Sequence, residues 1–308
     1  MKFTLITVAT EEVGYYKVLK ETAKINGYEM ITLGLGQLWT GYTMKYLLMK
    51  DYLDTRTIDP SSEEEILVFL DGYDTFVLND AKLLQSRYES FGKPLVFGAQ
   101  WNRKNGDKFT HFIIKTFSSG FDVVLNSGSY MGPIWVLKEK FDMLCSLFDC
   151  NITSQNDQKL LNKARKLQPN FFEKNMSIDK DGIIFHNAAY MSSLHYTALI
   201  KRCSLFNDIE IDKKDGNLLI RNTDIEPIFL SGPGNVDLKP YVQYKYDDLA
   251  DIIIDRGDYA YGFEFYKEFF TELTIYYGTL TLVIFIIIYV IYKFIKFINL
   301  QISRTPRI

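Results

Sequence analysis

Short apolar runs alternate with amphipathic stretches through the first half of the chain. Phe3–Val8, Tyr28–Leu33 and Ile66–Leu70 are rich in apolar and β-branched residues, which predicts strands. Ile66–Leu70 contains no polar residue, as is typical of a central strand covered on both faces. Glu11–Ile25 has apolar residues at helical spacing and stops at Asn26-Gly27, a pair that commonly ends a helix.

Further elements of both kinds follow along the chain. The pattern predicts strands at Leu95–Phe97 and Asp122–Leu125, and helices near residues 79–90, 134–148 and 155–167. This β-α-β order predicts an α/β fold with a mostly parallel central sheet and helices on both faces.

The last part of the chain has a different pattern. Residues 273–292 carry no charge and are about as long as a helix that crosses a bilayer, which predicts a transmembrane helix in contact with lipid. A buried core helix is the alternative, but the run is apolar on every face. The predicted organisation is therefore a head at 1–245, a juxtamembrane segment at 246–272, the span at 273–292 and a short basic tail at 293–308.

The side of the membrane on which the head lies stays open. The cations that follow the apolar run favour a cytoplasmic C-terminus and a head outside or in a lumen. The first ten residues nevertheless make a poor signal peptide, which favours a cytosolic head. Two N-x-S/T sequons, at Asn151 and Asn175, matter only in a lumen.

Composition excludes several classes of protein. The chain has 308 residues, of which 47% are hydrophobic and 15% aromatic, and this excludes a disordered chain. Residues 1–272 hold 31 cations and 38 acids, a net charge of −7, which argues against nucleic-acid binding. Cys145, Cys150 and Cys203 have no zinc-site spacing, and we expect them to be buried free thiols.

Two carboxylates follow the predicted central strand directly, in the sequence Asp71-Gly72-Tyr73-Asp74. Ligands of open α/β sheets bind beyond the carboxyl ends of the strands. Carboxylate oxygens suit Mg²⁺ or Mn²⁺, and such an ion would let an acidic head accept a diphosphate. The alternative is a solvated turn in which Asp71 caps the next helix.

Three glycine-bearing segments add to this pattern: residues 33–41, a polar loop expected at 125–132 and a late turn at 231–234. Each by itself is typical of an ordinary turn. In order along the chain, the motifs read TVAT, LGLG followed by Trp39, FLDGYD, LNSGSYMG, NDQ and IDKDGIIFHN.

Taken together, these motifs resemble the glycosyltransferase portion of the procollagen lysyl hydroxylase/glycosyltransferase enzymes. The collagen galactosyltransferases are a more distant match, and the resemblance runs from about Lys2 to Tyr244. It implies a GT-A type fold, Rossmann-like, that uses a UDP-sugar, either UDP-glucose or UDP-galactose, together with Mn²⁺ or Mg²⁺. It also implies that the acceptor is a hydroxyl group, by analogy hydroxylysine or galactosyl-hydroxylysine of a collagen-like chain.

The resemblance carries roles over by motif. Asp71 and Asp74 would hold the metal ion, and the ring of Tyr73 would stack on uracil. Thr10 would contact the nucleotide, and Trp39 would line the donor pocket.

The remaining motifs would surround the reacting sugar. Asp157 and Gln158, in the NDQ motif, would face the reacting sugar or the acceptor, and Asp157 is the candidate catalytic carboxylate. The residues that would lie under the donor sugar or approach the diphosphate are Asn126, Ser127, Gly128, Gly232 and Pro233.

The chain also departs from the family pattern. Where the family has a metal-binding histidine in its last loop, the motif alignment places Phe229, and His186 stands where the family has glutamine. This departure motivates an alternative function, a catalytically inactive, membrane-tethered scaffold that binds a nucleotide-sugar. A purely structural membrane protein is a third possibility.

Overall fold

A computed structural model describes most of the head and one helix near the C-terminus. The described residues are 1–56, 65–100, 121, 123–152, 155–188, 211–232, 236–254, 274, 278 and 281–297. The chain divides into two compact units, Met1–Arg256 and Gly257–Ile308.

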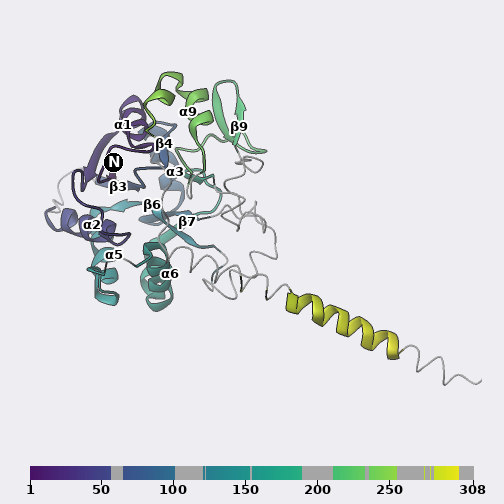
Figure 1. The fold of residues 1–308 in the computed structure, drawn as a ribbon. Helices are drawn as coiled ribbons and strands as arrows, with labels where there is room; N and C mark the ends of the chain where they lie inside the picture. Colours follow the sequence, from purple (N-terminus) through teal and green to yellow (C-terminus); the bar gives the residue numbers. More distant parts are fainter. Residues whose placement is uncertain are drawn as a thin grey trace, which may run out of the picture. The chain divides into compact units, whose positions relative to one another are not determined.

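Strands and helices alternate through the first unit (Figure 1). The strands are β1 (Lys2–Val8), β2 (Glu29–Leu33), β3 (Glu65–Leu70), β4 (Thr75–Val77), β5 (Leu95–Ala99), β6 (Leu125–Pro133), β7 (Met176–Asp179), β8 (Phe185–Asn187), β9 (Ile211–Lys214), β10 (Asn217–Ile220) and β11 (Phe229–Ser231). The helices are α1 (Tyr16–Ile25), α2 (Met44–Asp54), α3 (Ala81–Ser90), α5 (Ile134–Leu147), α6 (Asp157–Leu167), α7 (Pro169–Asn175) and α9 (Lys239–Lys245), with a 3₁₀ helix η3 (Asp247–Ile252).

The main sheet has six strands in the order β2-β1-β3-β6-β5-β7. β1 pairs in parallel with β2 and β3, and β5 pairs in parallel with β7. β6 is antiparallel to both of its neighbours, β3 and β5. Five strands therefore run in one direction and β6 runs in the other, so the sheet is mixed.

Helices cover both faces of this sheet (Figure 1). Alternate residues of β3 enter different cores, with Leu67 and Phe69 in the first and Ile66 and Val68 in the second. The first core also contains side chains of α2, α5, α6 and α7, and the second contains side chains of α1 and α3. The predicted α/β class, with helices on both faces, is confirmed.

A smaller sheet of β4, β11 and β8 packs beside α1 and extends the second core. A third core joins α9 and η3 to α1. The backbone of Ile254 pairs with Gly14, with N–O distances of 2.8 and 3.3 Å. Through these contacts, residues 246–254 pack as part of the first unit.

The element at 125–132 differs from its prediction. These residues were expected to form a loop, but Leu125–Pro133 is a fully buried central strand, β6. Its polar and small side chains are Asn126, Ser127, Gly128, Ser129 and Gly132. Small residues leave room for bulky neighbours in the adjoining strands and helices, and tertiary packing therefore overrides the local turn pattern here.

The second unit contains a continuous helix over residues 281–297. In the described part of the chain, no helix combines the length and the apolar character needed to cross a bilayer. Residues 273, 275–277, 279 and 280 of the predicted span lie outside the described residues. The membrane span at 273–292 is therefore not supported and stays a prediction.

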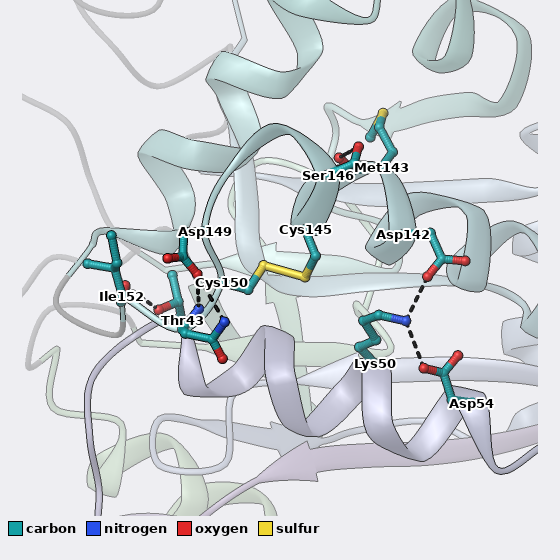
Figure 2. The surroundings of a disulfide bond; sticks show 11 residues. Thr43, Lys50, Asp54, Asp142, Met143, Cys145, Ser146, Asp149, Cys150 and Ile152 are labelled. Atoms are coloured by element: carbon teal, nitrogen blue, oxygen red, sulfur yellow. Dashed lines mark hydrogen bonds and ion pairs between the residues drawn. A yellow bond between two sulfur atoms is a disulfide. The ribbon is translucent and has the colours of Figure 1, made fainter.

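The expectation for the cysteines was wrong at two positions. Cys145, in α5, and Cys150, in the loop after it, form a disulfide bond with a Cα–Cα distance of 5.3 Å (Figure 2). The two residues are only five apart, so the bond closes a tight loop at the end of the helix. Cys203 lies outside the described residues.

Two buried ionisable groups lie near the small sheet. His186, in β8, is 1% exposed, and its ring nitrogens have no hydrogen-bond partner among the described residues. Burial lowers the pKa of His186 from 6.5 to about 4. Burial raises the pKa of Asp179 from 3.8 to about 6, although its carboxylate accepts hydrogen bonds from the backbone of Ile183, Ile184 and Phe185.

These shifts have opposite effects on stability below neutral pH. His186 makes its full contribution to the free energy of unfolding above pH 6.5. This contribution is lost as the pH falls through 4, because the unfolded chain takes up the proton at a higher pH than the folded one. The contribution of Asp179 is complete below pH 3.8 and is lost as the pH rises through 6. The two effects offset each other between those values.

Replacing His186 with leucine is expected to expose the effect of Asp179. Between pH 7 and pH 4 the variant should gain about 3 kcal/mol in free energy of unfolding relative to the unaltered protein, at about 1.4 kcal/mol per pKa unit. Urea unfolding of both proteins at several pH values measures this difference. A constant difference across that range would contradict the burial argument.

Candidate functional site

Three strand ends meet at one edge of the main sheet. β1 ends at Val8 and leads to Thr10, and β3 ends at Leu70 and leads to Asp71. Because β6 is antiparallel to β3, its first residues lie at the same edge, with Ser129 opposite Leu70. This topology brings the FLDGYD and LNSGSYMG motifs together.

Asp71 is held closely against Gly128. The Asp71 backbone N–H donates to the Gly128 carbonyl at 2.8 Å. A Cβ atom built on Gly128 would lie 2.2 Å from Asp71 Oδ2, so only glycine leaves room for this carboxylate. Asn126 supports the same turn, since its Oδ1 accepts from the Gly128 N–H at 2.6 Å.

Lys45, in the first turn of α2, links the two candidate acids. Its Nζ lies 3.0 Å from Asp71 Oδ1 and 2.7 Å from Asp157 Oδ2. The side chains of Lys45 and Asp157 are only 11% and 7% exposed, whereas that of Asp71 is 36% exposed. Burial by itself would lower the pKa of Lys45, but the carboxylates of Asp157 and Asp71 outweigh it and raise that pKa. The Lys45 ammonium therefore stays charged at neutral pH.

Asp157 begins helix α6, after the N-cap residue Asn156, whose side chain accepts from the Lys159 N–H at 3.0 Å. One Asp157 carboxylate oxygen accepts from the Gln158 N–H at 2.9 Å. The Tyr46 hydroxyl donates to the Asp157 carbonyl at 2.6 Å. The helix start and α2 thus fix the Asp157 carboxylate at the site from two sides, with one oxygen on Lys45.

Thr10 and Tyr73 are joined directly. The Tyr73 hydroxyl accepts from the backbone N–H of Thr10 at 2.8 Å and of Glu11 at 3.2 Å. The Gly36 N–H donates to the Thr10 carbonyl at 2.9 Å, and Gly36 has a φ of +80°, which favours glycine. These bonds hold the segment that carries Trp39, which is 40% exposed, close to the end of β1.

Asp74 connects the turn after β3 to the end of β11. Its carbonyl accepts from the Gly232 N–H at 2.7 Å, and its Oδ1 accepts from the Thr75 hydroxyl at 3.3 Å. That hydroxyl also lies 2.9 Å from Ser231 Oγ. Gly232 therefore lies beside Asp74, its predicted approach to the diphosphate stays a prediction, and Pro233 lies outside the described residues.

Phe229 does not border these carboxylates. It is completely buried in β11, where its ring stacks on Phe185 with centroids 5.6 Å apart. Ser231 lies two residues later in the same strand. Its hydroxyl contacts the hydroxyl of Thr75, the residue that follows Asp74. The Phe229 side chain therefore lies in the second core and not at the candidate metal site.

The carboxylates fit a hard divalent cation in number and chemistry. Among the described residues, no three Asp, Glu, His or Cys side chains converge as a complete metal site. Mg²⁺ commonly takes one or two carboxylates and completes its shell with water and substrate phosphates, and its ligands are oxygen atoms such as these. Asp71 and Asp74, which follow the end of β3 within four residues and are half-buried, are the two carboxylates that could supply such a pair.

A second lysine lies buried behind this site. Lys140, in α5, is 0% exposed, and its Nζ has no hydrogen-bond partner in the part of the chain that the structure describes. The amine lies 3.2 Å from the ring centroid of Tyr130 and 4.3 Å from that of Phe141. Burial lowers the pKa of Lys140 well below its ordinary value, against a smaller opposite effect of Asp157. Burial therefore favours the neutral amine over the ammonium form of Lys140.

Replacing Lys140 with methionine is expected to raise the free energy of unfolding by about 1–3 kcal/mol, the usual cost of a buried unpaired polar group. Methionine keeps the length of the side chain and removes the amine. Urea unfolding measures the change. Lys138→Met is the control, because Lys138 lies in the same helix as Lys140, α5, but forms a surface ion pair with Asp54 of α2. A loss of stability would mean that the aromatic rings hold a charged ammonium group.

The structure thus brings half of the predicted site residues into two groups. One contains Asp71, Asn126, Gly128 and Asp157, and the other is built around Thr10 and Tyr73. Asp157 lies at the site itself, whereas contacts of the Gln158 and Ser127 side chains are not among those described.

Sequence reasoning missed Lys45, which joins both acids. Its only signal was its place between Met44 and Tyr46, two apolar residues that begin a helix.

Comparison with known sequences gives a family match. The family model described as the PLOD GT domain matches residues 1–238. A rat (Rattus norvegicus) protein named multifunctional procollagen lysine hydroxylase and glycosyltransferase LH3 is 30% identical over 107 residues, or 32% of this chain and 14% of that protein. A Drosophila melanogaster procollagen-lysine,2-oxoglutarate 5-dioxygenase is 27% identical over 142 residues, or 42% of this chain and 19% of that protein. The matched segments are thus a small part of both relatives.

Solved structures give weaker likenesses. Mouse xyloside xylosyltransferase 1 in its apo form has a TM-score of 0.38 at 10% identity, over 77% of this chain and 99% of that one. A197 from STIV has a TM-score of 0.28 at 13% identity, over 45% of this chain and 68% of that one. Both TM-scores are below 0.5, and no functional conclusion follows from them.

Proposed function

The chain belongs to the family of the PLOD GT domain, and from this we propose that it transfers glucose or galactose from a UDP-sugar to a hydroxyl acceptor. By analogy with its procollagen lysine hydroxylase relatives, the proposed acceptor is hydroxylysine or galactosyl-hydroxylysine of a collagen-like chain. The observation that carries the proposal is the Lys45 bridge between Asp71 and Asp157, which places a candidate metal ligand and a candidate catalytic acid in one site.

In this proposal, Asp71 and Asp74 hold Mn²⁺ or Mg²⁺ against the diphosphate of the donor. When bound, the ion offsets the negative charge that develops on the departing UDP. The Tyr73 ring, anchored through its hydroxyl to Thr10 and Glu11, offers a fixed face for the uracil. Gly232, whose N–H donates to the Asp74 carbonyl at 2.7 Å, is the residue proposed to approach the diphosphate.

The reaction forms a bond between the acceptor oxygen and the anomeric carbon and breaks the bond from that carbon to UDP. Asp157 is the carboxylate proposed to face the reacting sugar. Lys45 contacts both Asp157 and Asp71 and so holds the two carboxylates in one site. Asn126, Ser127 and Gly128, at the start of β6, are the residues proposed to lie under the donor sugar, and Gly128 leaves room there for the Asp71 carboxylate.

A catalytically inactive, nucleotide-sugar-binding scaffold is the second candidate. It is favoured by the last motif, in which Phe229 stands where the family has a metal-binding histidine. In that case the site would bind a UDP-sugar without transferring it.

Titration of the purified chain with UDP, with and without Mn²⁺, tests the shared part of both candidates. We expect Mn²⁺ to tighten UDP binding, and the double variant Asp71→Asn with Asp74→Asn to abolish that gain. Asp54→Asn, a surface carboxylate paired with Lys50, is the matched control. Metal-independent binding, or an unchanged gain in the double variant, would exclude the site.

Hydrolysis of UDP-glucose and UDP-galactose then separates the two candidates. Release of UDP that depends on Asp157 supports the enzyme. Metal-dependent binding without release from either donor, with or without a galactosyl-hydroxylysine peptide, supports the scaffold.

A further inference from the structure

The loop closed by the disulfide also carries one of the two N-glycosylation sequons. Cys150 is followed directly by Asn151-Ile152-Thr153, and the second sequon is Asn175-Met176-Ser177. Sequons are common by chance, so the surroundings of each asparagine decide what it can carry.

The structure separates the two asparagines by burial. Asn151 is exposed, and its side-chain Nδ2 donates to Asp149 Oδ1 at 3.0 Å on the outer side of the loop. Asn175 is 4% exposed, at the end of α7 where the chain enters β7. A folded protein can carry a bulky glycan on Asn151 but has no room for one on Asn175.

The loop around Asn151 is also well anchored. Asp149 Oδ1 accepts from the Asn151 N–H at 3.0 Å, and the Thr43 hydroxyl donates to the Ile152 carbonyl at 2.9 Å (Figure 2). The disulfide ties the same loop back to α5. These contacts use the backbone of the loop and leave the Asn151 side chain at the surface.

The disulfide is an independent sign of the compartment. Disulfide bonds form and persist in oxidising compartments and are rare in the cytosol. The Cys145–Cys150 disulfide and the exposed sequon beside it therefore both indicate an oxidising lumen.

We propose that the first unit of this protein folds in the lumen of the secretory pathway and carries one N-linked glycan, on Asn151 and not on Asn175. An oligosaccharyltransferase would form the bond between Asn151 Nδ2 and the sugar C1. The lipid-linked diphosphate of the donor would leave with the electron pair of the broken C1–O bond, and Nδ2 would lose one proton. The proposal is independent of the transferase activity.

Expression of the full chain in eukaryotic cells, followed by peptide N-glycosidase treatment, tests the proposal. We expect one step of increased mobility after treatment in the unaltered chain and in Asn175→Gln, and none in Asn151→Gln. Mass spectrometry should find the Asn151 side chain converted to a carboxylate by the enzyme. Peptide mapping without reduction should find Cys145 joined to Cys150.

A second version of the chain, expressed with a cleavable secretion leader at its N-terminus, separates a wrong compartment from a wrong glycosylation site. A glycan on Asn151 only in the leader version would overturn the assigned compartment. No glycan in either version, or a glycan on Asn175, would overturn the assigned site. Because folding and UDP binding are measured separately, none of these outcomes bears on the proposed transferase function.

Discussion

Replacing Lys45 with methionine is expected to lower the free energy of unfolding by about 3–5 kcal/mol, the usual result of removing one partner of a buried ion pair. Methionine keeps the length of the side chain but has no charge. Asp157, with a side chain only 7% exposed, would then lose the ammonium that lies 2.7 Å from its Oδ2. The cost comes from the carboxylate that stays buried, more than from the lost attraction.

Urea unfolding at neutral pH measures this change, and Lys50→Met is the matched control. Lys50 lies in the same helix and pairs with Asp54 and Asp142 at 2.7 and 2.8 Å, but these partners are solvent-exposed. Surface ion pairs contribute about 0–1 kcal/mol, so the control should lose little stability. Equal losses in the two variants would contradict the idea of a buried bridge.

A double variant, Lys45→Met with Asp157→Asn, tests the physical reason. If the uncompensated carboxylate is the main cost, removing its charge should restore much of the stability lost in the single variant. UDP-sugar hydrolysis should be lost in both variants, because the Asp157 carboxylate is misplaced in Lys45→Met and missing in the double variant. Normal hydrolysis in Lys45→Met would remove Lys45 from the site.

Gly128→Ala is expected to slow UDP-sugar hydrolysis by about 100-fold, the usual cost of a 1 Å displacement in a site, and to weaken metal-dependent UDP binding. The new Cβ would lie 2.2 Å from Asp71 Oδ2 and 2.6 Å from its Cγ. No real Cβ tolerates these distances, so the Asp71 carboxylate must move. Its contact with Lys45, now 3.0 Å, would be lost or lengthened.

Gly132→Ala is the matched control, because Gly132 lies in the same strand at the end away from Asp71. A Cβ there would lie 2.9 Å from the Pro94 carbonyl oxygen, so this variant should lose stability as well. It should nevertheless bind UDP and Mn²⁺ normally once folded. Calorimetric titration of both variants below their unfolding temperatures measures the difference. Normal binding in Gly128→Ala would show that the position of Asp71 is not important.

Much of the fold follows from local patterns in the sequence. The apolar run Ile66–Leu70 lies within the central strand β3, because no polar residue in it could face water. The helices expected near 79–90, 134–148 and 155–167 correspond to α3, α5 and α6. Asp71 and Asp74 could be found because they follow a strand of this kind, and Asp157 because it begins a helix in a family motif.

The prediction failed where distant parts of the chain decide the outcome. β6 was taken for a loop because its small and polar residues resemble a turn, yet it is buried between β3 and β5. Lys45 received no role because a lysine among apolar residues has no meaning until its partners are known. The cysteines were expected to be free because their spacing matches no known framework, whereas proximity at the end of α5 pairs two of them.

The sequence by itself therefore determined the α/β class, the strands β1, β2, β3 and β5 and the place of the two carboxylates after β3, because each depends on neighbouring residues. Only the tertiary structure decided that Asp71 and Asp157 share one ammonium group, that Gly128 must lack a side chain, and that Asn151 is exposed while Asn175 is buried. Those features depend on strand direction and on packing between residues far apart in the chain, such as Lys45 and Asp71, 26 positions apart. Local periodicity carries no information about such contacts.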